Sequence, residues 1–370
     1  MEISLDDLKP IVTDTDDTRR TICWFTPPTD SDPRIRKRVW VEWQSMQPHH
    51  LHNLQAGAEP HVLERFRALV SLLREDLYTR QFNAVKCLGY CQCIQTQRGP
   101  GQQHITEHAE LSYGLVFENP RGIDPSWRYI TLLELLESSQ DVRAIRSLSA
   151  RITLMKSLAE CIERLHAINW LHKGLRSDNI LFFFDPHSSS SHGEHWHDQI
   201  AISNPFLSGF TYSRPESARY MSENPPAVAG EDFYRHPAIQ GAGGPRDSSG
   251  ARGGYRRFHD IYSLGIILLE IAYWRPVYRI LGYKNPRQAR PLEIAEAREE
   301  LLSGRCRRKL ESLVGDDVAE VIMDCIEGVS VFGSESESGG HAAGDHGEGN
   351  VDLQRNFYDA VVKKLVDLHI

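Results

Sequence analysis

Glycine is missing from the start of this chain, where the first glycine is Gly57. A glycine-rich turn that cradles phosphate groups with its backbone N–H groups is therefore excluded before that residue. Long apolar runs are also missing, because the longest, Ile261 to Tyr273, is too short to span a bilayer. Basic charge is not in excess: 42 Lys and Arg stand against 50 Asp and Glu, for a net charge of −8. This balance gives no support for a nucleic-acid partner.

Two further absences concern targeting and cysteine patterns. Met1 to Asp7 contain neither a basic stretch nor an apolar one, so we expect no signal peptide. The seven cysteines are an odd number, and Cys91 and Cys93 are spaced too tightly for a zinc finger. We therefore expect buried or free thiols in a reducing compartment, and a cytoplasmic protein without a membrane contact.

The composition is that of a globular protein, with 40% apolar and 25% charged residues among 370. This length predicts one large or two medium domains with a proper core. Residues 1–34 are polar, and we expect an irregular, flexible start with a strand pair only within Arg20 to Phe25. Arg38 to Gln44 alternate and are rich in β-forming residues, which predicts a strand. Val62 to Leu73 have helical periodicity, which predicts a helix entered at Pro60.

Two more strands are expected before the pattern changes. The sequence pattern predicts one strand at Phe82 to Ile94 and another at Leu111 to Glu118. After Glu118 the chain becomes helical, with predicted helices at Tyr129 to Glu137 and at Ser147 to His166, the latter with Ser149 as a cap. Composition predicts flexible insertions at 185–198, 240–254 and 333–350, and periodicity predicts further helices at 292–302, 318–327 and 353–368.

One segment carries a family resemblance. Leu171 to Leu181 read Leu-His-Lys-Gly-Leu-Arg-Ser-Asp-Asn-Ile-Leu, and this resembles the catalytic loop His-Arg-Asp-Leu-x-x-x-x-Asn of eukaryotic protein kinases. His172, Leu175 and Asn179 stand at matching offsets. The helix that runs into this loop is similar to the kinase E-helix. Phe258 to Glu270, an apolar segment, is similar to the kinase F-helix, Asp-x-(Trp/Tyr)-Ser-Leu-Gly.

The resemblance implies an α+β, bilobal protein-kinase-like fold. Residues 1–118 would form a small antiparallel β lobe with one helix, and residues 119–370 a larger, mainly α-helical lobe, with a hinge at 119–122. Within the superfamily the chain is most similar to fungal kinase-like domains linked to heterokaryon incompatibility and immune-type signalling. That narrower resemblance rests on four short stretches: Val41–Trp43, Cys87–Tyr90, Gly114–Glu118 and Tyr234–Pro237.

The same resemblance assigns catalytic positions, and most of them hold residues that cannot do the chemistry. The phosphate-cradling glycines are missing. Gln44 stands at or near the phosphate-binding lysine, Gly174 at the catalytic aspartate, and Leu207 at the metal-binding aspartate. Asn179, at the position of the second-metal ligand, is the one candidate cofactor-binding residue. Phosphoryl transfer depends on positioning and charge stabilisation, so these losses predict an inactive protein.

Other matching positions are structural. The resemblance assigns His172, Leu175, Gly209 and Asp260 to bracing of the fold. Gly209 belongs to Leu207-Ser208-Gly209, which aligns with the kinase Asp-Phe-Gly turn. We expect Asp260 to accept backbone N–H bonds from the loop around His172, although an Asp at this place is also a good helix N-cap.

Three functions stay open at this point. The first is a catalytically inactive pseudokinase that acts as a signalling or interaction module with protein partners, needing no cofactor and no metal. The second is a divergent active kinase that uses Lys86 for the phosphates, Asp178 as base, and Asp185 or Asp198 for metal. The third is an ATP-binding protein without phosphoryl transfer, and ATP and Mg²⁺ enter only under these two alternatives.

Overall fold

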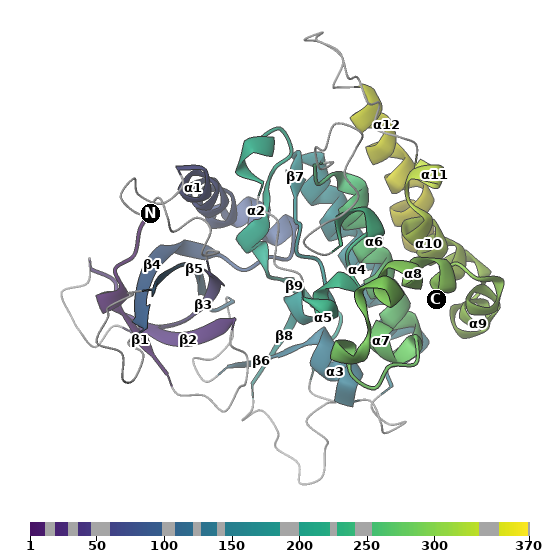
Figure 1. The fold of residues 1–370 in the computed structure, drawn as a ribbon, viewed down its shortest axis with the longest axis horizontal. Coiled ribbons are helices and arrows are strands. Elements are labelled where there is room, and N and C mark those ends of the chain that lie inside the picture. Colours follow the sequence, from purple (N-terminus) through teal and green to yellow (C-terminus); the bar gives the residue numbers. More distant parts are fainter. Residues whose placement is uncertain are drawn as a thin grey trace.

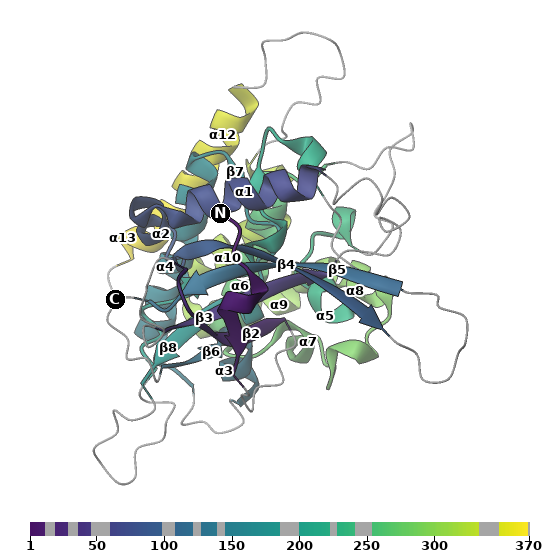
Figure 2. The same cartoon turned by 90° about the vertical axis from the view of Figure 1, so that its left-hand side faces the viewer.

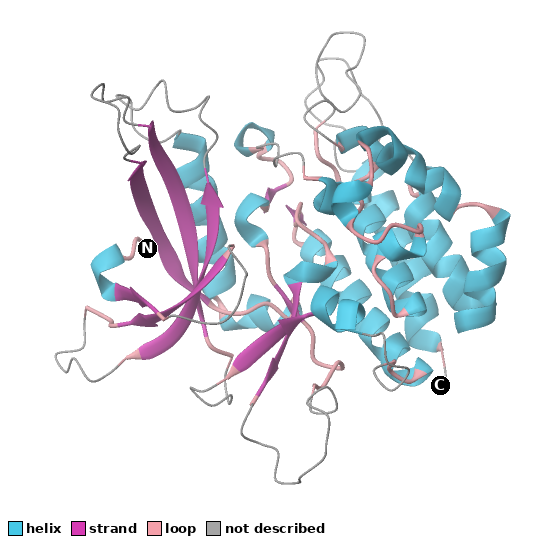
Figure 3. Cartoon of the chain, turned by 60° about the horizontal axis from the view of Figure 1, so that its bottom comes forward, coloured by secondary structure: helices cyan, strands magenta, loops and turns pink. Residues whose placement is uncertain are grey.

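The structure, a computed structural model, describes residues 1–11, 19–28, 36–45, 60–97, 108–120, 127–138, 145–185, 200–222, 228–240, 254–332 and 348–368. A five-stranded antiparallel sheet lies on one side of the molecule and a mainly helical part on the other (Figure 1). The predicted α+β class is confirmed. Coloured by secondary structure, the strands gather in the sheet and in a smaller group next to the helices (Figure 3).

The sheet has the strand order β1-β2-β3-β5-β4. It curls so far that the first residues of the chain bridge its two edges: Ile3 N donates to Tyr90 O of β4 at 2.8 Å, and Tyr90 N donates to Met1 O at 3.0 Å. Its strands are β1 (Leu8–Pro10), β2 (Arg20–Phe25), β3 (Lys37–Ser45), β4 (Cys87–Gln97) and β5 (His108–Glu118).

The irregular start predicted for residues 1–34 is wrong for Leu5 to Pro10, where a 3₁₀ turn (Leu5–Asp7) and β1 lie. Within Arg20 to Phe25 the structure has a single strand, β2, in place of the predicted strand pair, and β2 pairs with β1 and β3. The reason is tertiary: Ile3, Leu8 and Phe25 are buried inside the curled sheet together with Val39 and Val41. Burial of these apolar side chains by distant strands orders a segment whose own composition is polar.

Helix α1 (Pro60–Arg74) covers the other face of the sheet, and α2 (Asp76–Gln81) follows it (Figure 2). The alternation along β3 explains both contacts, because successive side chains of a strand point to opposite faces. Val39 and Val41 enter the sheet interior, whereas Trp40 joins the core that contains α1. The predicted strand at 38–44 and the predicted helix entered at Pro60 are confirmed.

Two boundaries differ from the predictions. β4 begins at Cys87 instead of Phe82, because α2 and a turn with Asn83 at φ 47° come first. The predicted helix at 129–137 begins as β6 (Arg128–Thr131), and only then becomes α3 (Leu132–Ser138). β6 pairs with β8, more than 40 residues later, a non-local contact that outweighs local helical periodicity.

The helical part is built around α4 (Leu148–Ala167) and α6 (Arg257–Tyr273). The cap of α4 is Ser147 and not Ser149, since Ser147 Oγ accepts from Ala150 N at 3.2 Å. The short strands here are β7 (Trp170–Leu171), β8 (Ile180–Phe184), β9 (Phe206–Leu207) and β10 (Arg214–Pro215). The remaining helices are α5 (Ala229–Asp232), α7 (Val277–Ile280), α8 (Pro291–Leu301), α9 (Gly304–Val314), α10 (Asp316–Glu327), α11 (Val329–Phe332), α12 (Glu348–Phe357) and α13 (Lys364–Asp367).

One apolar core runs from α1, through the face of the sheet that α1 covers, to α4, α6 and α10. α6 is buried along nearly its whole length, as its apolar sequence predicts. All seven cysteines are free thiols, of which five are buried. In the described ranges, no helix is both long and apolar enough to cross a membrane.

Several predictions fall on residues outside the described ranges. These are most of the three flexible insertions and half of the hinge at 119–122. The insertion predicted at 333–350 overlaps the start of α12 at Glu348.

Candidate functional site

The site lies where the sheet faces the segment His172–Asn179 and the turn after β9. β8 begins directly after Asn179, and β9 pairs with it through Ile180 and Leu207. Leu207 N also donates to Asn83 O at 2.8 Å, which ties this pair of strands to the chain entering β4. The loop and the turn therefore meet β3 from the helical side.

A buried arginine joins the two sides of this site. Arg20 Nε of β2 donates to Glu42 Oε1 of β3 at 3.2 Å. Its NH2 group donates to Asn179 Oδ1 at 2.7 Å and to Ser208 Oγ at 2.9 Å. Glu42 in turn accepts from Gly209 N at 2.9 Å. We call these five residues, Arg20, Glu42, Asn179, Ser208 and Gly209, the Arg20 cluster.

Each acceptor in the Arg20 cluster is held by a second hydrogen bond. Asn179 Nδ2 donates to Gly174 O at 2.7 Å, which points its Oδ1 at Arg20. Ser208 Oγ donates to Asn179 O at 3.0 Å and so presents its lone pairs to the arginine. Arg20, Glu42, Asn179 and Ser208 are all at most 5% exposed. A buried guanidinium beside a buried carboxylate is a charge pair in which neither partner is left uncompensated.

Two glycines make the close approach of these segments feasible. A Cβ at Gly174 would lie 2.6 Å from Gly209 O, and a Cβ at Gly209 would lie 2.1 Å from Asn179 Nδ2. Gly209 also has φ 78°, a conformation that other residues adopt at a cost. Gly174, predicted at the catalytic aspartate position, is thus a place where a side chain would press on the backbone of the turn after β9.

Aromatic rings fill the space beside the Arg20 cluster. Trp40 of β3 is 1% exposed, and its ring lies 5.4 Å from that of Phe117 in β5. It lies 5.7 Å from Trp127 and 5.5 Å from Phe183 of β8. Phe206 of β9 contacts Phe183 at 5.2 Å. These five side chains, the Trp40 cluster, pack the sheet against the strands of the helical part.

Gln44 and Leu207, the residues predicted at the lysine and metal-aspartate positions, do not face the Arg20 cluster. Gln44 faces α1, where its Oε1 accepts from Arg65 at 3.0 Å. The β3 side chain that reaches the turn after β9 is Glu42, two residues earlier. Leu207 is buried in the core, and Gly209 is the residue of this turn that abuts Asn179. The two predicted residues therefore do not face each other, and the groups that meet between β3 and this turn are the carboxylate of Glu42 and the backbone N–H of Gly209.

Two of the residues assigned to bracing of the fold, His172 and Asp260, are joined by a hydrogen bond. Asp260 is fully buried and accepts from His172 N at 2.8 Å and from Lys173 N at 2.9 Å. Tyr255 OH donates to it at 2.7 Å, and His166 Nε2 lies 3.2 Å away. The prediction that Asp260 braces the loop around His172 is confirmed, and the N-cap of α6 is instead Arg256.

Burial alone would raise the pKa of Asp260, but the hydrogen bond and charge of His166, with His172 and Tyr255, lower it overall. Burial also lowers the pKa of His172 to about 4, against the raising effect of Asp260. The His172 ring lies 4.6 Å from the ring of Phe210, and Leu175 is buried close by in the chain. The loop is therefore anchored by an ionised carboxylate and a neutral imidazole.

The residues that an active enzyme would recruit are engaged elsewhere. Asp178 is bound by Arg176 Nε at 2.5 Å and by Arg19. Burial would raise the pKa of Asp178, but Arg176 and Arg19, with Arg20, lower it to about 2. Lys86 pairs with Asp76 at 3.2 Å. Asp185 directly follows β8, and Asp198 lies outside the described residues.

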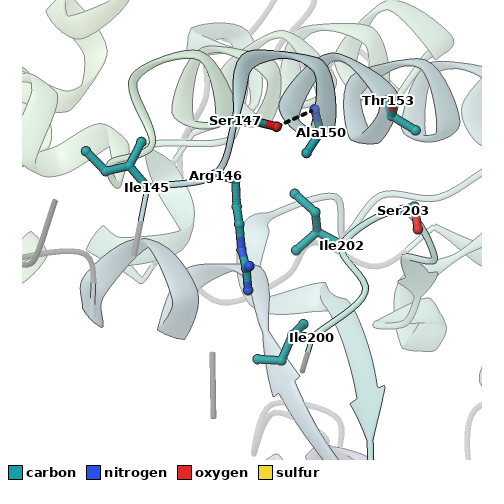
Figure 4. A pocket seen from close by; sticks show the side chains of 8 residues that line it. All are labelled: Ile145, Arg146, Ser147, Ala150, Thr153, Ile200, Ile202 and Ser203. Atoms are coloured by element: carbon teal, nitrogen blue, oxygen red, sulfur yellow. Dashed lines mark hydrogen bonds between the residues drawn. The ribbon is translucent and has the colours of Figure 1, made fainter. Parts of the chain in front are cut away.

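An open pocket of about 410 Å³ lies between the start of α4 and the turn that precedes β9, and none of its lining residues belongs to the Arg20 cluster or the Trp40 cluster (Figure 4). Ile145 and Arg146 line one side, and Ile200 and Ile202 the other. Over the ranges the structure covers, no three His, Cys, Asp or Glu side chains come together as a metal site.

Neither a protein-family model nor a curated protein matches this chain.

Proposed function

We propose that this chain is a catalytically inactive protein-kinase-like domain that works as an interaction module in signalling. In a kinase-like fold the nucleotide would lie in the cleft between the sheet and the segment His172–Asn179. The observation that supports the proposal is that the chain's own Arg20 cluster and Trp40 cluster join the sheet to the helical part there.

The arrangement of elements supports a bilobal, kinase-like fold. The sheet with α1 forms a small lobe, and the helical part around α4 and α6 forms a larger one. The bond from His172 N to Asp260 links the catalytic-loop-like segment to the F-helix-like segment, as the resemblance implies. This similarity concerns shape, and the activity has to be argued from the site.

The site's geometry favours a revised register for two positions. Glu42, the β3 side chain facing the turn, takes the place of the phosphate-binding lysine. Gly209, next to Asn179, takes the place of the metal-binding aspartate, with Phe210 packed on His172 after it. The revised register strengthens the proposal. It places the anion Glu42 where a kinase has the cationic lysine, and Gly209, which has no side chain, where a kinase has the metal-binding carboxylate.

ATP and Mg²⁺ do not fit the residues present. Asn179 Oδ1, the oxygen that would bind a metal, already accepts a hydrogen bond from Arg20. Glu42 offers phosphate oxygens no cation, and its pairing with Arg20 leaves no net positive charge at this pair. Gly174 offers no group to take a proton from a hydroxyl. The groups that position a phosphoryl group and stabilise its charge are therefore missing at Glu42, Gly174 and Gly209.

The proposal is tested by phosphoryl transfer from γ-labelled ATP in the presence of Mg²⁺ or Mn²⁺, onto the chain itself and onto a generic protein substrate. We expect no transfer above that of Asn179→Ala, the matched variant that lacks the only kinase-like metal ligand. Metal-dependent transfer that Asn179→Ala abolishes would overturn the proposal. The partners we propose are proteins, in a cytoplasmic setting.

A further inference from the structure

The acceptors of the Arg20 cluster converge on one small volume. Glu42 Oε1, Asn179 Oδ1 and Ser208 Oγ lie 3.2, 2.7 and 2.9 Å from two nitrogen atoms of a single planar guanidinium. All three acceptors belong to side chains at most 5% exposed. Three buried acceptors aimed at one point select a cation and reject an anion.

The acceptors are oriented by bonds that do not involve Arg20. Gly209 N holds Glu42, Gly174 O holds the amide of Asn179, and the carbonyl of Asn179 holds the hydroxyl of Ser208. A site whose groups are fixed in advance loses little freedom when its ligand enters. The geometry also favours a forked donor over a point charge, because Nε and NH2 lie on one edge of the guanidinium and use it together.

We infer that the cleft contains a built binding site for a guanidinium group, and that Arg20 fills it as an internal ligand. The inference rests on the proposed function, since it concerns the same cleft and says what replaced the nucleotide there. Arg20 and Glu42 come from β2 and β3, whereas Asn179, Ser208 and Gly209 belong to the helical part. The filled site therefore clamps the sheet to the helical part, which is the bridging task that a nucleotide and its metal perform in a kinase.

The test is chemical rescue of Arg20→Ala. This variant keeps the acceptors and removes the guanidinium, so its thermal midpoint should fall well below that of the unaltered chain. Millimolar methylguanidinium should then raise the midpoint in a saturable way, because a ligand that binds only the folded state stabilises it. The unaltered chain should show no such rise, and neither should Arg20→Ala with methylammonium, which lacks the fork.

The matched control is Lys37→Ala. Lys37 is also a cation paired across the sheet, with Glu118 at 3.1 Å, but it is 48% exposed. Its removal should change the midpoint little, and methylguanidinium should not affect it. Equal rescue of both variants, equal rescue by methylammonium, or no rescue of a folded Arg20→Ala would each overturn the inference.

A second measurement covers the case in which Arg20→Ala does not fold. In the unaltered chain labelled with ¹⁵N-arginine, the guanidinium of Arg20 should give an N–H signal that exchanges slowly with water. Ser208→Ala, which removes one acceptor, should shift that signal. If no protected arginine signal responds to Ser208→Ala, the inference fails. Neither the rescue nor the arginine signal depends on ATP turnover. Phosphoryl transfer by the unaltered chain would contradict the proposed function alone. Failed rescue in a chain that transfers no phosphoryl group would contradict only this inference.

Discussion

The carboxylate of Asp260 connects α6 to the loop at His172 through hydrogen bonds. Its removal should be among the most destabilising changes in the chain. Asp260→Ala leaves the backbone N–H groups of His172 and Lys173 buried without their acceptor. It also leaves the hydroxyl of Tyr255 without its acceptor. Each unsatisfied buried donor costs about 1–3 kcal/mol, so the free energy of unfolding should fall by about 4 kcal/mol.

Two further variants calibrate this value. Asp260→Asn keeps one acceptor oxygen and should cost less, about 1–3 kcal/mol. Asp352→Ala removes an exposed aspartate of α12 and should change the free energy of unfolding by less than about 0.5 kcal/mol. The assay is urea unfolding followed by tryptophan fluorescence, with equal slopes required before midpoints are compared. A loss below about 1 kcal/mol for Asp260→Ala would refute the bracing role.

Three further predictions concern the histidines, the aromatic cluster and the glycine contact. Burial holds the pKa of His172 at about 4 and that of His259 at about 3, below the ordinary value of 6.5. The stabilisation by these neutral rings is therefore complete above pH 6.5 and is lost as the pH falls through the folded-state values, costing about 3 kcal/mol for His172. Urea midpoints that do not fall between about pH 7 and pH 4.5 would contradict this. Trp40→Ala should lower the free energy of unfolding by about 3–5 kcal/mol in the same assay, and a loss below about 1 kcal/mol would mean that the ring is not packed as described. Gly174→Ala should cost about 1–3 kcal/mol, because its Cβ would press on Gly209 O, and Gly174→Asp should restore no phosphoryl transfer. An active Gly174→Asp would contradict this prediction.

Local patterns predicted the elements whose contacts are local or repetitive. The alternation along Arg38 to Gln44 identified β3, and the helical period after Pro60 identified α1. The start of the chain could not be predicted in this way, since Ile3 and Leu8 become ordered only when the curled sheet buries them. The same holds for Arg128 to Thr131, which pair with a strand far along the chain.

The candidate site was located by its motifs and not by its contacts. Asp260 was assigned correctly because its partner loop resembles a known one. The Arg20 cluster was not predicted, since its bonded members are separated by up to 188 residues, between Arg20 and Ser208. One signal was available: Arg20 and Glu42 are opposite charges within two apolar strands, where a charge is stable only when paired. Neighbouring antiparallel strands could have suggested that pair.

The most direct test of the central claim is the thermal unfolding midpoint of the unaltered chain with ATP, with and without Mg²⁺. If Arg20 and Trp40 fill the cleft, ATP has no space in which to bind the folded chain. The unfolding midpoint should therefore not change at any ATP concentration. A nucleotide that binds only the folded chain at 100 times its Kd would add about 2.7 kcal/mol, a shift well within reach of the measurement. A saturable rise with ATP would contradict the account.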